Sequence, residues 1–264
     1  ADVLQKMMQI ETRAVAVQYA VVILCIIAAI LMFVPVFAID EKKYCHSAPS
    51  TIPLKQALRE SLRNKNFLYF LTACFAYFMS LNLITNGLLY DVTVLANLPE
   101  SYGSKFMGFM VLLSLLFYPV VNIFVRRTGE KRLMIVSFFI LAFAFTGIAL
   151  LGKLPIEPRL QLFILLAMAA FPAAALGILP NAILAGIAAK DTKETGDSKE
   201  GTYFAVNYFA AKLGQTFGIA LFAALTIYGK DPGHDEGLRL TGICGFVLCL
   251  LAGLVFTRFK ELKD

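Results

Sequence analysis

The apolar residues of the chain fall into seven long runs separated by short polar segments. The runs cover residues 15–39, 67–95, 105–125, 133–151, 160–189, 203–228 and 239–259. A helix needs about 20 residues to cross about 30 Å of hydrocarbon. No run shows the alternation of polar and apolar residues that marks a membrane strand. The pattern therefore predicts an all-α polytopic membrane protein with seven transmembrane helices.

The longest connection, residues 40–66, carries a weaker helical pattern. Four apolar residues recur at helical spacing, with basic residues between them: Leu54, Ala57, Leu58 and Leu62. Thr51 suits an N-cap, and Pro53 suits a first helical turn. We expect a short basic amphipathic helix that lies on the cytoplasmic surface of the membrane. The alternative is a solvated linker.

Composition supports a membrane protein. Hydrophobic residues make up 59% of the chain and charged residues 16%, whereas a soluble domain carries about 45–50% and about 25%. Such a chain has too little polar surface to cover a water-soluble globule. The net charge of +6 does not indicate nucleic-acid binding, because the basic residues cluster between the apolar runs.

The distribution of basic residues predicts the orientation of the chain. With the start of the chain outside, sixteen of the 24 Lys and Arg residues fall on the inside and seven on the outside. The excess predicts an outer N-terminus and a cytoplasmic C-terminus in the plasma (inner) membrane. The chain begins with Ala1 and no signal peptide precedes the first run. We therefore expect a C-terminal piece of a larger protein.

Lys212 lies in the middle of an apolar run. Tyr203 precedes it by nine residues, which corresponds to about 14 Å along a helix. A charge at this depth usually faces a cavity or a partner and marks a transport pathway. The alternative is that Lys212 pairs with a carboxylate or backbone carbonyls and only holds helices together. Asn207 and Tyr203 lie about 140° and 180° around the helix from Lys212, and each is alternatively an interhelical hydrogen bonder.

A second polar group interrupts the run 67–95. Asn82, Thr85 and Asn86 share one helix face, and Tyr90 follows one turn later. These side chains are suited to hydrogen bonds with sugar hydroxyls, and the alternative is that they join helices to one another. Asp91 falls near the outer end of this run, which favours a solvated or gating role over a buried one.

Other residues add little chemistry. Pro172 and Pro180 predict a kinked helix in the run 160–189, and Asn122 and Asn181 are further polar points in apolar runs. Kinks near the midplane often line transport cavities. The five cysteines form no C-x-x-C pair. We therefore expect no metal site, no organic cofactor and no enzymatic activity.

Three segments resemble a known family. They are LRNKNFLYFLTACFAYFMSLNLITNGLLYDV (62–92), RRTGEKR (126–132) and AILAGIAAKDTKETGDSKEGTYFAVNYFAAKLGQTFG (182–218). Together they resemble the glycoside–pentoside–hexuronide:cation symporter family, the melibiose-carrier branch of the major facilitator superfamily. The last segment matches the family's signature T-G-x-R-x-E-G, followed by a span with a lysine, through Thr195, Gly196, Glu200, Gly201 and Lys212.

The resemblance covers nearly the whole chain and implies helices 6–12 of a twelve-helix fold. Residues 1–39 would then end the N-terminal bundle, residues 40–66 form the middle cytoplasmic loop, and residues 67–264 form the C-terminal six-helix bundle. In the family, the lysine at Lys212 and the polar residue at Asn207 line the central cavity. The cation-binding carboxylates lie mainly in the N-terminal half. The resemblance implies Na⁺ or H⁺ as the coupling cation.

The resemblance also implies a cytoplasmic gate built from charged side chains. We expect its members to be Arg126, Arg127, Lys131, Arg132, Asp191 and Glu200. The chain departs from the family pattern here, because Gly186 and Ala189 stand where acidic residues are usual and Ser198 stands where an arginine is usual. Lys199 is a partial substitute for that arginine, although lysine does not reproduce bidentate pairing.

The expected function is cation-coupled symport of a sugar, glycoside or related polar solute by alternating access. Its partners are the solute, the cation, the lipid bilayer and the N-terminal helices of the same protein, and nucleic acid is not among them. One alternative is a lysolipid or drug transporter of the same superfamily. Another is a seven-helix receptor, which shares the topology, but the long connection 40–66 argues against it.

Overall fold

The computed structural model describes residues 13–38 and 53–261. The chain divides into two compact units, residues 1–49 and 50–264. The first unit contains one described helix, α2 (Arg13–Ala38), whose sequence is largely apolar after Arg13 and Gln18. Thr51, the expected N-cap, lies outside the described residues.

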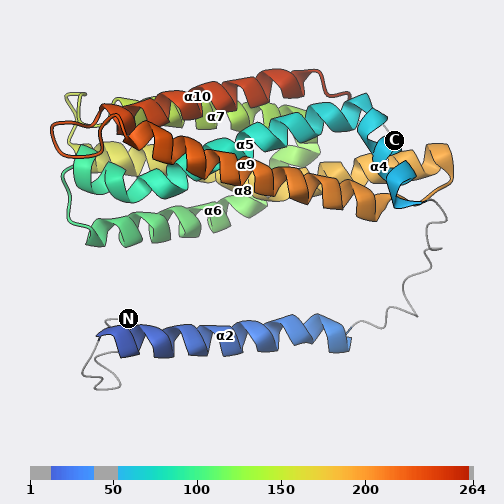
Figure 1. Ribbon diagram of the computed structural model, residues 1–264, viewed down its shortest axis with the longest axis horizontal. Helices are drawn as coiled ribbons and strands as arrows, with labels where there is room; N and C mark the ends of the chain where they lie inside the picture. Colours follow the sequence, from blue (N-terminus) through green and yellow to red (C-terminus); the bar gives the residue numbers. More distant parts are fainter. Residues whose placement is uncertain (1–12, 39–52, 262–264) are drawn as a thin grey trace. The chain divides into compact units, whose positions relative to one another are not determined.

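The second unit is a bundle of long helices (Figure 1). Its elements are α4 (Leu54–Arg63), α5 (Lys65–Tyr90), the π-helix η1 (Asp91–Leu95), α6 (Ser101–Thr128), α7 (Glu130–Ala149), α8 (Pro158–Thr195), α9 (Glu200–Thr226) and α10 (Glu236–Thr257). With α2, seven helices in the described part of the chain are long and apolar enough to cross a membrane. The predicted all-α class and the seven spans are confirmed.

α4 confirms the expected helix in the connection 40–66. Ala57 and Ser61 are buried, and α4 packs against α9. The leucines Leu54, Leu58 and Leu62 remain exposed. Ala57 of the predicted apolar face thus packs within the bundle, whereas its three leucines stay available for the membrane surface on which we expect α4 to lie. Pro53 sits at the N-cap position and not in the first turn.

Glycines hold α5 and α9 close together. A Cβ added at Gly214 would lie 2.7 Å from the carbonyl oxygen of Phe75, and one added at Gly218 would lie 2.5 Å from that of Met79. The two glycines form a G-x-x-x-G pattern, which lets membrane helices pack backbone to backbone. Because later residues of α9 meet later residues of α5, the two helices run parallel.

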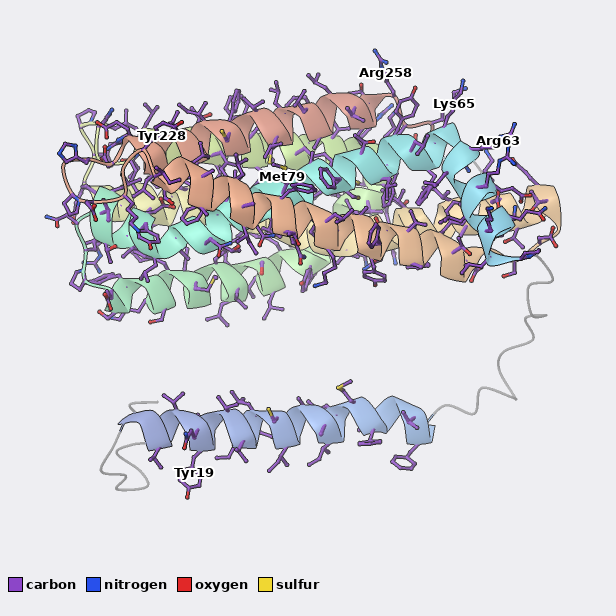
Figure 2. All side chains as sticks on the ribbon, viewed as in Figure 1. Tyr19, Arg63, Lys65, Met79, Tyr228 and Arg258 are labelled. Carbon is purple, nitrogen blue, oxygen red and sulfur yellow. The ribbon has the colours of Figure 1, made fainter. Side chains whose placement is uncertain are left out.

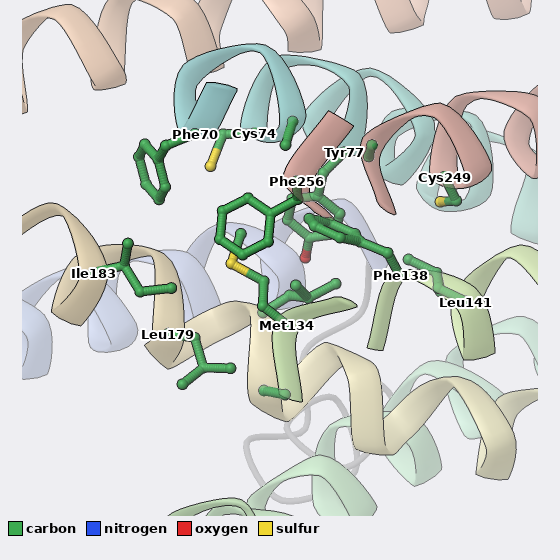
Figure 3. Close-up of a cluster of buried hydrophobic side chains, with 14 of the residues drawn as sticks. Phe70, Cys74, Tyr77, Met134, Phe138, Leu141, Leu179, Ile183, Cys249 and Phe256 are labelled. Atoms are coloured by element: carbon green, nitrogen blue, oxygen red, sulfur yellow. The ribbon is translucent and has the colours of Figure 1, made fainter. Parts of the chain in front are cut away.

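Aromatic and aliphatic side chains fill the interior between α5, α7, α8 and α10 (Figure 3). The Phe138 ring of α7 lies 6.0 Å from the Tyr77 ring and 6.2 Å from the Phe256 ring, measured between centroids. α8 continues through both Pro172 and Pro180 as one helix (Pro158–Thr195), and both prolines are buried. The core thus forms on the α7–α10 side of α5, while much of α9 lies outside it.

Candidate functional site

The exposed faces of two neighbouring spans differ in chemistry. Along the middle of α10, the exposed stripe is apolar and consists of Ile243, Val247, Leu251 and Leu254. The exposed stripe of α9 contains Lys212 and Thr216 in the middle of the span. The labelled basic residues Arg63, Lys65 and Arg258 lie instead at one end of the bundle, the end that carries α4 (Figure 2). The α10 stripe suits lipid acyl chains, whereas the ammonium of Lys212 requires a polar environment, although Phe209, Leu213 and Phe217 are exposed beside it on α9.

Lys212 points away from α5. It is the thirteenth of the 27 residues of α9, and it is exposed. Gly214 and Gly218 face α5, and helix geometry places Lys212 about 140° around the axis from them. The Lys212 ammonium donates a hydrogen bond to Gln215 Oε1 at 3.2 Å, and Thr216 Oγ1 donates one to the Lys212 carbonyl at 2.9 Å. These three residues form one polar group, which we call the Lys212 face.

Asn207 and Tyr203 lie on the opposite side of α9. Both are buried, with 4% and 0% of their surfaces exposed. The Tyr203 hydroxyl accepts a hydrogen bond from Asn64 Nδ2 at 3.4 Å, and its ring meets the Phe67 ring edge-on at 4.8 Å. The structure therefore does not bring these two expected cavity residues to Lys212.

The polar residues of α5 divide into two groups. Asn82 and Tyr90 lie along α9: the Asn82 Cβ would lie 2.9 Å from a Cβ at Gly218, and the Tyr90 ring lies 6.0 Å from the Phe222 ring. Thr85 and Asn86 are exposed. Their side chains donate to backbone carbonyls of α5 itself, at 3.1 Å from Leu81 and 2.8 Å from Asn82. These hydrogen bonds to the backbone of α5 fix the orientation of both side chains, and with it the direction in which the Thr85 hydroxyl oxygen and the Asn86 amide oxygen can accept hydrogen bonds.

Asp91 is buried, which corrects the expected solvated position. Only 3% of its surface is exposed, and its Oδ1 has no hydrogen-bond partner among residues 53–261. The helix does not end at Asp91, because η1 continues it to Leu95. Side chains from α6, α7 and α8 then enclose the carboxyl group. Sequence position alone could not reveal this enclosure.

A buried lysine joins three segments at the α4 end of the bundle. The Lys199 side chain is 1% exposed, and its Nζ lies 2.8 Å from Glu60 Oε2 of α4 and 3.1 Å from Asp191 Oδ2 of α8. The same Nζ donates to Thr195 Oγ1 at 3.4 Å. We call these four side chains the Lys199 cluster. It connects α4 to the C-terminal end of α8 immediately before α9 begins.

Hydrogen bonding stabilises the charged forms of this cluster. The Lys199 hydrogen bond, followed by that of Gln56, lowers the pKa of Glu60 below its ordinary value of 4.5. Burial acts to lower the pKa of Lys199, but its hydrogen bonds to Glu60 and Asp191 outweigh burial and raise that pKa above 10.5. The cluster therefore contributes its full stabilisation between these two pH values. It loses it as pH falls through the lowered pKa of Glu60 or rises through the raised pKa of Lys199.

The residues expected at the gate occupy two places. Asp191 belongs to the Lys199 cluster, and Glu200 follows Lys199 but is exposed. The four basic residues lie on both sides of the α6–α7 turn, where Gly129 has φ of 84°: Arg126, Arg127, Lys131 and Arg132. Glu60 was missed. The sequence feature that could have indicated a role for Glu60 is that it is the one acidic residue in a helix whose other charged residues are basic.

Replacement of Lys199 by methionine should release α4. Two carboxylates then lose a shared cation, so the backbone amides of Leu54–Arg63 should exchange hydrogen for deuterium several-fold faster at neutral pH. Lys190→Met is the matched control, because Lys190 and Glu194 are exposed and 4.0 Å apart, and such pairs contribute little. Equal exchange rates in both variants would show that Lys199 does not hold α4.

In the unsubstituted protein, α4 exchange should show no step between pH 5 and 10 beyond the intrinsic pH dependence, because both shifted pKa values lie outside that range.

A comparison with protein families gives one match to this chain. The family model described as MFS/sugar transport protein matches residues 3–260, nearly the full length. No curated protein and no solved structure gives a significant match.

Proposed function

The chain belongs to the MFS/sugar transport family of the major facilitator superfamily, and from that premise we propose that it carries a sugar, glycoside or related polar solute by cation-coupled symport. Membership makes it a superfamily transporter. Such proteins move solutes and are generally not enzymes. The seven-helix receptor is thereby excluded. The melibiose-carrier branch, the solute and the coupling cation are parts of the proposal.

The observation that carries the proposal is the Lys212 face. An ammonium at the centre of a membrane helix costs about 2.5–3.5 kcal/mol on insertion scales. Lys212 is exposed on the second unit at that depth, whereas the exposed stripe of α10 is apolar. A cost of this size favours a face of α9 that meets water, solute or carboxylates over one that meets acyl chains.

Lys212 supplies the coupling in this mechanism. Its ammonium pairs with carboxylates from other membrane helices of the same protein, and cation and solute binding change that pairing. The glycine contacts make α5 and α9 one rigid pair, so a change at Lys212 moves both helices together. Thr85 and Asn86 of α5 are then available to hydrogen-bond solute hydroxyls. The Lys199 cluster closes the α4 end, which is cytoplasmic in this proposal.

One observation favours a second candidate, a lysolipid transporter. Tyr208 and Phe209 precede Lys212 by four and three residues and are 56% and 66% exposed. They therefore share the Lys212 side of α9. An amphipathic ligand places its anionic headgroup at the lysine and its acyl chain along these rings. This candidate needs the same lysine but a different solute.

A transport screen separates the candidates. The full-length protein, reconstituted in proteoliposomes, is offered radiolabelled sugars, glycosides and a lysolipid, with and without imposed Na⁺ and H⁺ gradients. We expect a gradient to accumulate at least one polar solute, and an ionophore that collapses the gradient to abolish accumulation. Vesicles without protein are the control. Accumulation of the lysolipid alone supports the second candidate, and accumulation of no solute under either gradient contradicts both.

A further inference from the structure

Asp91 is a buried carboxyl group that the proposed mechanism does not use. It begins η1 at the end of α5 and is 3% exposed. Its Oδ1 has no hydrogen-bond partner in the part of the chain from residue 53 to 261. Within a membrane span, such a group indicates a functional site. A single turn of π-helix is itself frequent at functional sites.

The carboxyl group borders a small, largely enclosed cavity. The cavity has a volume of about 20 Å³ and is lined by residues of α5, α6, α7 and α8 together with Asp91. Every other lining residue is apolar, including Leu88 of α5, Met110 of α6 and Leu162 of α8. The space holds about one water molecule. Asp91 is thus the one polar side chain among the residues that line this cavity.

We propose that Asp91 is a proton-binding site, which makes the proton a coupled or regulatory cation of the transporter; this inference rests on the proposed transport function. An ionised, unpaired carboxylate in an apolar enclosure is costly, whereas the neutral acid is tolerated. A metal cation requires several oxygen ligands, and this cavity offers the oxygens of one side chain. Groups of three or more His, Cys, Asp or Glu that could hold a metal are also absent from the described residues. The lining therefore selects a proton over Na⁺.

The position of Asp91 explains how the proton is exchanged. The helices that enclose the carboxyl group are packed around the end of α5 opposite to α4 (Figure 1). When this end opens, water enters the cavity and the carboxylate takes a proton from the water on that side, forming the carboxylic acid. The neutral acid is stable while the cavity is dry, and in coupled transport it releases its proton to water admitted from the opposite, α4 end, leaving the carboxylate. The lining residues from α6, α7 and α8 include no titratable group, and the nearest one along the chain is Tyr90.

Infrared difference spectroscopy tests the site without a known solute. The full-length protein is titrated with acid and base in lipid, and the carbonyl stretch of protonated carboxyl groups is recorded. The unsubstituted protein should show one carboxylic acid band that Asp91→Asn lacks. Gly87→Ala is the matched control, because its new Cβ would lie at ordinary contact distances of 3.5 Å from Phe222 and 3.6 Å from Asp91 Oδ2. That variant should keep the band. Identical spectra for Asp91→Asn and the unsubstituted protein would overturn the proposal.

Transport gives a second readout. With a solute from the screen, Asp91→Asn should lose accumulation driven by a proton gradient at least tenfold, yet retain solute exchange at equal pH, which moves no net proton. Full proton-driven accumulation in this variant overturns the proton site and leaves the transport function standing. If no solute is transported by the unsubstituted protein, the transport function fails, and the infrared spectra still decide whether Asp91 binds a proton.

If Asp91→Asn does not assemble, Asp91→Glu replaces it in the infrared experiment. Glutamate should shift the frequency of the band, and an unshifted band would also overturn the proposal.

Discussion

Lys212→Ala should reduce gradient-driven solute accumulation by roughly 5- to 150-fold, the range that corresponds to a coupling free energy of about 1–3 kcal/mol. The alanine removes the one charge on the exposed face of α9 at mid-span. Its side chain makes its described hydrogen bond to Gln215, within α9, so packing of α5 against α9 should not change. The variant should therefore be inserted in the membrane in normal amounts. The loss is measured as initial uptake and steady-state accumulation in proteoliposomes of equal protein content.

Two further variants show whether the charge itself is responsible. Lys230→Ala removes the same charge from an exposed loop position and should leave uptake unchanged. Lys212→Arg keeps the charge with a different geometry and should retain part of the uptake. Full accumulation in Lys212→Ala would refute the assignment of Lys212 to the coupling step. If Lys230→Ala lost as much gradient-driven accumulation as Lys212→Ala, the effect would come from the change in net charge and not from the position of Lys212.

Gly218→Ala should destabilise the protein by about 1–3 kcal/mol, the usual cost of overpacking an interface that cannot yield. The new Cβ would lie 2.5 Å from the Met79 carbonyl oxygen and 2.9 Å from the Asn82 Cβ. One of these atoms belongs to the backbone of α5 and the other is a Cβ. Neither can move by a side-chain rotation, so α5 and α9 must separate to make room for the new Cβ. The melting temperature of the purified protein in detergent should fall by roughly 2–4 °C for each kcal/mol. Transport should fall as well, because α5 and α9 no longer move as one pair.

Gly108→Ala is the control for this prediction. Gly108 also lies within a span, α6, but an added Cβ would meet no atom within 4 Å among the described residues beyond its own stretch of helix. Alanine favours a helix over glycine by about 0.8–1.0 kcal/mol, so the melting temperature should stay constant or rise. A fall in Gly108→Ala equal to that in Gly218→Ala would show that the effect comes from any glycine in a span and not from the α5–α9 contact.

The spans could be predicted from the sequence because hydropathy acts on each segment separately. Each apolar run is long enough to form its own helix, and the structure confirms all seven. The helix ends were less predictable, because polar residues extend helices beyond the hydrocarbon. α8 continues to Thr195 and ends where Gly196 adopts φ of 80°, a left-handed cap that a glycine permits.

The site was only partly predictable, because its geometry depends on packing between distant segments. Glu60 and Lys199 are 139 residues apart in the sequence but form an ion pair of 2.8 Å. The sequence predicts Asp91 near a solvated helix end. In the structure, η1 continues the helix and side chains of three neighbouring helices surround the carboxyl group. The depth of Lys212 and its separation from Asn207 followed from helix geometry alone. Which of the two faces is buried required the fold.

Thiol accessibility tests most directly whether the Lys212 face lines an aqueous solute path. Thr216→Cys lies one turn after Lys212 on the exposed side of α9, and Val247→Cys lies at mid-span on the exposed, apolar stripe of α10. Each variant of the full-length protein is treated in membranes with a charged, membrane-impermeant thiol reagent, and the reactivity of the native cysteines is subtracted. Labelling of the cysteine at 216, slowed by the transported solute, together with no labelling at 247, is the predicted result. Protection of both positions to the same extent would contradict the account, since α9 would then face lipid as α10 does.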